Sequence, residues 1–199
     1  MAGHRALVAA GRSIVDLLNR RFDDLIPAGD RRPVAVLAGT ADFDQVNSSP
    51  TAVIRFPAIS VYCYRISVDR ETRAGWSAVA STDGIPRIPL RMHILFAAWD
   101  TVVESELEWL GLTAQVIESE SILTGPTLHP SGEWEPGDAI QVVPDELALD
   151  SLSEAFQALT TDYRLSLPYV ARVIRIHGRR EQVTEPVATV GTAVRGLGT

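Results

Sequence analysis

The sequence of 199 residues contains no lysine and a single cysteine, Cys63. Without lysine there is no phosphate-loop lysine, no Schiff-base lysine for a pyridoxal cofactor and no Ser-x-x-Lys hydrolase site. A single cysteine cannot form an intramolecular disulfide, which favours folding in the cytoplasm. No apolar run approaches the roughly 20 residues that span a bilayer, so we expect no membrane insertion.

Motifs that carry chemistry are also missing. The sequence has no Gly-x-Ser-x-Gly elbow and no His-Glu-x-x-His pair, and its four histidines lie on distant segments. His129, in a loop with Glu133 and Glu135, is the best metal candidate, although a solvated polar loop explains these residues equally well. His93 is expected to be a packed or hydrogen-bonded structural residue. We therefore predict no enzymatic activity, no catalytic residue, no cofactor and no metal site.

Positive charge is absent from a long central interval. Residues 92–163 contain 14 of the 25 acidic residues and no basic one, whereas residues 1–91 and 164–199 each carry net positive charge. The whole chain has a net charge of −7, which is unfavourable for binding nucleic acid phosphates. The asymmetry suits head-to-tail contacts between copies, but a solvated acidic face explains it as well.

Hydrophobic periodicity predicts alternating helices and strands. An amphipathic helix, rather than a targeting sequence, is expected over residues 4–25, and residues 40–50 read as a loop. Further helices are expected at 102–123 and 150–159, and strands at 34–39, 58–70, 90–99, 139–144 and 165–176.

The same patterns predict which faces are buried. The first helix should bury Leu7, Gly11, Ile14, Leu18, Phe22 and Leu25, and the second Val103, Leu107, Leu110, Ala114 and Ile117. In the strand at 58–70, alternation places Ile59, Val61 and Cys63 on one face and Tyr62, Tyr64, Ile66 and Val68 on the other. In the strand at 90–99, Leu90, Met92, Ile94 and Phe96 share one face.

The order of these segments resembles the cap, or tube-terminator, family of extracellular contractile injection systems of the antifeeding-prophage type, which are phage-tail-like particles. The resemblance spans roughly residues 4–176. It is carried by the N-terminal helix, "ISVYCYRISVDR", "IPRIPLRMHILFAAW", the helix with the pair Leu110–Gly111, and "ELALDSLSEAFQALTTDYRLSLPYVARVIRI".

The resemblance implies a mixed α/β (α+β) domain like phage tail-terminator proteins, with a mostly antiparallel sheet flanked by helices. It implies a homohexameric ring that caps the inner tube and sheath of a particle assembled in the cytoplasm. The particle's inner-tube and sheath proteins would then be its partners. An alternative in the same class is another phage-tail-like completion or adaptor protein. A small-molecule-binding domain that uses Tyr62, Tyr64, His93 and Trp99 is a further alternative.

We expect two parts in the chain, a cap domain at residues 1–177 and an extended tail at 178–199. The tail has no core pattern but contains the β-favouring segments "QVT" and "VATV", so we expect it to serve as an assembly arm. The expected assembly contacts are Arg172, Arg175, Arg179, Arg180 and Arg195.

Overall fold

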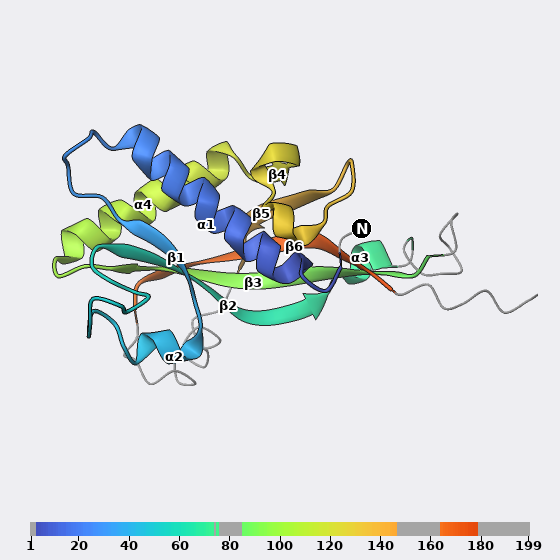
Figure 1. The fold of residues 1–199 in the computed structure, drawn as a ribbon, viewed down its shortest axis with the longest axis horizontal. Coiled ribbons are helices and arrows are strands. Elements are labelled where there is room, and N and C mark those ends of the chain that lie inside the picture. The colour runs from blue at the N-terminus through green and yellow to red at the C-terminus, as the bar shows by residue number, and fades with distance from the viewer. Residues whose placement is uncertain (1–2, 74, 76–84, 147–163, 179–199) are drawn as a thin grey trace, which may run out of the picture.

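The fold is built on one six-stranded sheet with the strand order β1-β2-β3-β6-β5-β4 (Figure 1). The computed structural model describes residues 3–73, 75, 85–146 and 164–178. Its strands are β1 (Val34–Ala38), β2 (Ala58–Val68), β3 (Arg87–Trp99), β4 (Ile122–Thr124), β5 (Ala139–Pro144) and β6 (Ser166–His177). Only β1 and β2 pair in parallel among these strands; the other neighbours are antiparallel. The expectation of a mostly antiparallel sheet in a mixed α/β fold is confirmed.

Two long helices, α1 (Ala6–Leu25) and α4 (Val103–Ser119), cover one face of this sheet (Figure 1). The main hydrophobic core lies between them and the inward side chains of β2, β3, β5 and β6. On the opposite side lies α2 (Thr40–Phe43), a short helix where the sequence predicted only a loop. A second short helix, α3 (Arg70–Arg73), follows β2. The helix expected at 150–159 and the tail beyond Gly178 fall outside the described residues.

The predicted buried stripe of α1 is correct except at its end. Ile14, Leu18 and Phe22 are buried, but Leu25 is 54% exposed. Leu25 is the last residue of the helix, where it lines a surface cavity instead of contacting the sheet. The small residues Ala6, Ala9 and Ala10 are buried as well, which lets α1 lie close to the sheet.

The predicted stripe of α4 is wrong in the first half of the helix. Val103 and Leu107 are 53% and 56% exposed, whereas Glu106 and Trp109 are buried. The reason is polar: Glu106 accepts a hydrogen bond from the backbone N–H of Asp100, and the Trp109 indole donates to the Asp100 carboxylate. These hydrogen bonds set the rotation of the first turns of α4. They outweigh the free energy that burying Val103 and Leu107 would provide. Leu110 and Ile117, further along, are buried as predicted.

A β-bulge in β2 changes the faces predicted for its second half. The register with β3 shifts between Cys63 and Arg65, so two residues of β2 lie opposite one of β3. Beyond the shift, Ile66 pairs with Met92 and Val68 with Leu90, on the face that the helices cover. The prediction for Ile59 and Val61 is correct, as is the one for the inward face of β3. Ile66 and Val68 were assigned to the wrong face because alternation counted from sequence cannot register an inserted residue.

Candidate functional site

The face of the sheet opposite α1 and α4 carries a hydrogen-bonded histidine at its centre. His93 of β3 is buried, and its Nδ1 lies 2.7 Å from the Asp145 carboxylate. Its Nε2 lies 2.9 Å from the Ser67 hydroxyl and 3.2 Å from the Arg65 guanidinium. Nδ1 thus faces the Asp145 carboxylate, and Nε2 faces the Ser67 hydroxyl and the Arg65 guanidinium. The expectation that His93 is packed or hydrogen-bonded is confirmed.

Asp145 ties this cluster to a third element, because it follows β5 directly. Besides His93, it accepts a hydrogen bond from the Tyr64 hydroxyl at 3.4 Å. Burial, together with the nearby Asp145 carboxylate, raises the pKa of Tyr64 to about 12. The tyrosine therefore stays protonated and remains a donor, and residues from β2, β3 and the end of β5 are held in one network.

Ser67, His93 and Asp145 together have the composition of a serine hydrolase triad. A working triad also needs preorganised donors for an oxyanion and a cavity for the substrate. The Arg65 guanidinium occupies the Nε2 side of the ring, and neither Ser67 nor His93 lines any of five well-formed cavities on the described part of the chain. Ser67, His93 and Asp145 instead form a hydrogen-bonded clamp that joins β2, β3 and the end of β5.

A second polar cluster on the same face contains one of the predicted assembly residues. The buried Asp69 carboxylate lies 2.9 Å from the Arg91 guanidinium, which also contacts Glu71 at 3.1 Å. Arg172 lies 3.6 Å from Glu71. Arg175, a further predicted assembly residue, pairs with the buried Asp138. Both arginines thus have carboxylate partners within their own chain, while Arg179, Arg180 and Arg195 lie outside the described residues.

A third cluster lies where β3 ends. Asp100, whose side chain is fully buried, pairs with Arg31 at 2.8 Å, and Glu106 pairs with Arg164 at 3.0 Å. Burial alone would raise the pKa of Asp100, but hydrogen bonds from Trp109, the Thr101 backbone and Arg31 outweigh it and hold that pKa below its ordinary value. Asp100 and Glu106 each have an arginine partner and at least one further hydrogen-bond donor. This cluster therefore fixes the start of α4, and neither carboxylate is left unpaired.

The residues considered for metal or small-molecule binding do not gather at one site, although Tyr64 and His93 meet in the network with Asp145. Nδ1 of His129 bonds to the Ser131 hydroxyl, and no group of three or more metal-ligating side chains exists among the described residues. Tyr62 and Trp99 both pack against Phe43, with ring centroids 5.1 and 5.6 Å apart, and the Trp99 indole donates to Ser60. Trp99 and Phe43 lie in a second hydrophobic core against which Tyr62 packs, and Tyr62 also lines the apolar groove described next.

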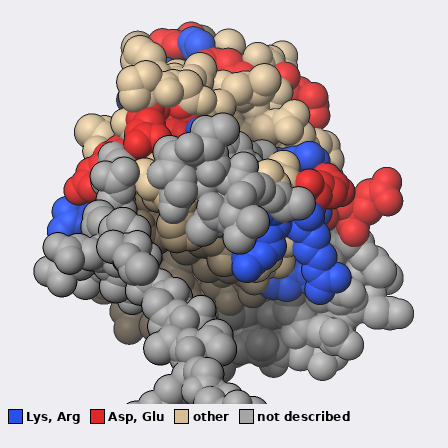
Figure 2. Space-filling view, turned by 90° about the vertical axis from the view of Figure 1, so that its right-hand side faces the viewer, with Lys and Arg blue, Asp and Glu red and all other residues tan. Residues whose placement is uncertain are grey.

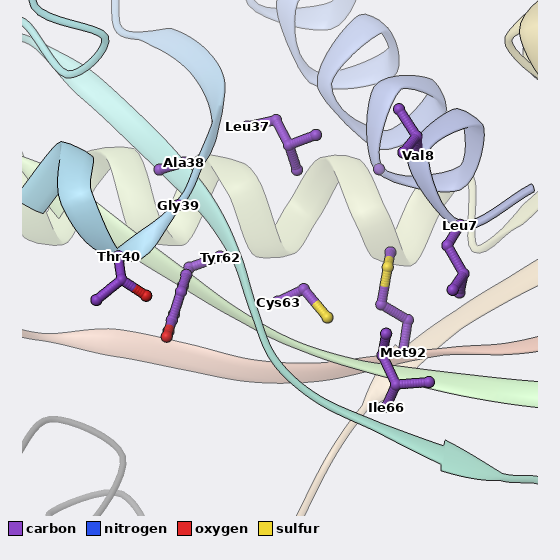
Figure 3. A pocket seen from close by; sticks show the side chains of 11 residues that line it. Leu7, Val8, Leu37, Ala38, Gly39, Thr40, Tyr62, Cys63, Ile66 and Met92 are labelled. Carbon is purple, nitrogen blue, oxygen red and sulfur yellow. The ribbon is translucent and has the colours of Figure 1, made fainter. Parts of the chain in front are cut away.

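An apolar groove lies on the other side of β2, beneath the N-terminal half of α1. Figure 3 shows Leu7 and Val8 of α1 above it, Leu37 beside it and Cys63, Ile66 and Met92 below. Its volume is about 490 Å³. No charged side chain lines it, so its surface suits hydrophobic contacts.

An unpaired strand edge runs along this groove. The five residues of β1 pair with β2 only from Ala58 to Tyr62. The residues of β2 from Cys63 to Val68 pair with β3 on one side and with no described strand on the other. The backbone groups of this open β2 edge are therefore available to a further strand.

The charged side chains at one end of the molecule are mixed in sign. Figure 2 looks onto the end of the sheet where α3 lies and shows arginine side chains gathered beside acidic ones. Arg70 and Arg73 of α3 are exposed there. No helix among the described residues combines the length and hydrophobicity needed to cross a membrane.

A family model described as the Pvc16 N-terminal domain matches residues 9–189, which is most of the chain. The chain belongs to the Pvc16 N-terminal domain family. A comparison with curated proteins finds no match. The family membership confirms the resemblance read from the order of helices and strands, and it accounts for the sheet and helix layer described above.

Solved structures share the fold of this Pvc16 N-terminal domain. One is the sheath/tube terminator of an extracellular contractile injection system, PVC, in its extended state, with a TM-score of 0.56 and 19% identity. Another is the tube-terminating cap of the anti-feeding prophage, with a TM-score of 0.52 and 16% identity. The matches cover 96% and 94% of this chain, but only 64% and 61% of the two terminators. This chain thus spans less than two thirds of either terminator's length.

Sequence reasoning missed two features of this Pvc16 N-terminal domain. It found no partner for His93, because Ser67 and Asp145 are 26 and 52 residues away along the chain. It also did not predict the open β2 edge, which depends on the different lengths of β1 and β2. The mismatch between the expected strands at 34–39 and 58–70 was the one available signal.

Proposed function

We propose that this protein is a structural cap that terminates the inner tube and sheath of a contractile injection system particle as a hexameric ring. The observation that carries the proposal is the family match over residues 9–189. The fold shared with two tube terminators supports it. The proposed partners are the tube and sheath proteins of a particle that assembles in the cytoplasm and is released from the cell.

The charge at the two ends of the domain supports a head-to-tail ring. Glu104 and Glu108 are exposed in the first turns of α4, which follows the end of β3. Arg70 and Arg73 are exposed in α3, at the opposite end of the sheet (Figure 1). Exposed acidic residues at one end can pair with the arginines that stand among the mixed charges of the other end in a heterologous contact, which closes into a ring when the rotation between copies permits.

The proposal also assigns separate roles to two parts of the chain. Residues 1–177 form the cap domain, and residues 178–199 act as an assembly arm through which Arg179, Arg180 and Arg195 contact a neighbouring subunit. We assign the protein no enzymatic activity, because the polar residues gathered on the open face of the sheet are used as clamps between strands.

A hydrolase is the second candidate, and the Ser67–His93–Asp145 array favours it. A fluorophosphonate probe separates the two functions, because it labels only a serine that its histidine activates. We expect no labelling of the wild-type protein. Labelling that disappears in Ser67→Ala would favour the hydrolase.

Imaging and light scattering test the cap directly. Particles assembled without this protein should have missing ends and irregular lengths, and adding back the gene should restore both. The purified protein should form rings visible in negative stain, and light scattering should show that they dissociate as the salt concentration rises. A protein that stays monomeric at every concentration and salt level, and particles that stay normal without it, would overturn the proposal.

A further inference from the structure

The groove and the open β2 edge together form a surface that only an extended chain can fill. Cys63 to Val68 present backbone donors and acceptors along one side, and α1 overhangs them with Leu7 and Val8 (Figure 3). A helix cannot use the strand's backbone groups, whereas a β-strand both bonds to them and sends alternate side chains into the groove. The occupant must therefore be a strand.

The exposed side chains at this surface define what kind of strand fits. Val8 and Ile66 are both 49% exposed, and Leu37 is 39% exposed. Apolar side chains that face water beside an unpaired edge favour uncontrolled association, so such an edge is usually covered in the assembled state. The groove offers no charge to pair with, so the strand should carry small or β-branched uncharged residues on the side facing it.

A segment of this chain outside the described residues has that composition. Residues 186–194, PVATVGTAV, contain no charged residue and include three valines and two threonines. These nine residues exceed the six positions of the open β2 edge from Cys63 to Val68. Proline stands at the first position, where a strand tolerates it.

The direction of β6 favours delivery of this segment to a second copy. Because β6 and β2 both pair antiparallel with β3, they run in the same direction, and β6 leaves the sheet at the end where β2 also finishes. Gly178 is held at that point by its backbone N–H, which donates to Pro86 at 2.8 Å. To reach its own groove the chain would have to reverse, yet residues 179–185, RREQVTE, contain none of the usual turn residues Gly, Pro, Asn, Asp or Ser.

We infer that residues 186–194 of one copy add a strand to the open β2 edge of a second copy and place alternate side chains in the groove beneath α1. This inference rests on the proposed ring, since each copy then provides one strand and accepts one. The assembly arm would then bind to a specific site, the groove beside the open β2 edge, which contains the only cysteine of the chain.

Cys63 makes the inference testable by disulfide trapping in the full-length protein. Single cysteines are introduced at three consecutive positions of the segment, as the variants Ala188→Cys, Thr189→Cys and Val190→Cys. Each variant is oxidised with copper phenanthroline and run on a non-reducing gel. The matched control for each is the same variant with Cys63→Ser, which removes the acceptor thiol.

We expect covalent dimers and higher ladders that depend on Cys63 and whose yield alternates with a period of two along the segment, because alternate residues of a strand face opposite sides. Disulfides confined within single chains would show that the segment occupies its own groove and would overturn the inference. Equal yields at all three positions, or ladders that persist with Cys63→Ser, would also overturn it. Rings that form normally without any trapping would refute the inference and leave the proposed function intact, whereas absence of rings would refute both.

Discussion

The two faces of the central sheet are stabilised by different interactions. The face beneath α1 and α4 is apolar, with Ile94 and Phe96 of β3 almost completely buried against the helices. The opposite face carries charged and hydrogen-bonded side chains along β2, β3 and β6, among them His93 and Arg91. Its one apolar region among the described residues is the smaller core around Trp99 and Phe43.

The apolar face thus contributes mainly to stability, and the polar face mainly to the alignment of the strands. Burial of apolar area gives most of the free energy of folding and depends little on exact geometry. Hydrogen bonds contribute less net free energy, but they specify which side chains meet and how the strands are aligned. We therefore expect substitutions on the helix-covered face to lower stability most, and substitutions on the polar face to have smaller effects.

The largest effect is expected from Leu110→Asp on α4. Leu110 is buried against the sheet, so the new carboxylate would lose its hydration without gaining a partner. The free energy of unfolding should fall by roughly 3 kcal/mol or more, measured by chemical denaturation. Glu108→Ala on the exposed side of the same helix is the control and should change it by less than about 0.5 kcal/mol. The reverse order would show that the rotation assigned to α4 is wrong.

A smaller effect is expected from Asp145→Ala on the polar face. The substitution removes the acceptor of both His93 and Tyr64 and leaves their donor groups without a partner. Unfolding, followed by chemical denaturation, should become easier by about 1–3 kcal/mol. A loss larger than that caused by Leu110→Asp would mean that the polar face, not the helix-covered core, dominates folding.

The smallest effect is expected at His177, at the end of β6. Burial lowers the pKa of His177 below its ordinary value of 6.5, and neither ring nitrogen has a hydrogen-bond partner among the described residues. As the pH falls below 6.5, the unfolded chain binds this proton before the folded chain does, so stability is lost until the pH reaches the lower folded pKa. This loss cannot exceed about 1.4 kcal/mol per pH unit.

His177→Leu removes that titration without removing a hydrogen bond. The variant should lose less stability than the wild type as the pH falls from about 6.5 to about 5 in thermal melts. An unchanged pH dependence would show that other groups carry the whole effect.

The sequence predicted the sheet and the two long helices because their apolar periodicity is strong, as in α1 and β3. It failed where a polar interaction or an inserted residue overrides that periodicity. The buried Glu106 rotates the start of α4, and the shift between Cys63 and Arg65 reverses the second half of β2. The partners of His93 and the open β2 edge depend on which strands become neighbours, and local sequence does not encode that information.

The bulge in β2 determines two surfaces at once. By placing both Tyr64 and Arg65 beside His93, the extra residue builds the polar clamp, and the same shift brings Ile66 to the groove beneath α1. Removing Tyr64 or Arg65 would restore regular alternation and leave Ile66 at the groove, but only one of these two side chains would remain beside His93. An additional residue inserted after Arg65 would instead turn Ile66 toward the clamp. The length of this strand is therefore under a double constraint, because a deletion in the bulge weakens the clamp and an insertion after it removes Ile66 from the groove.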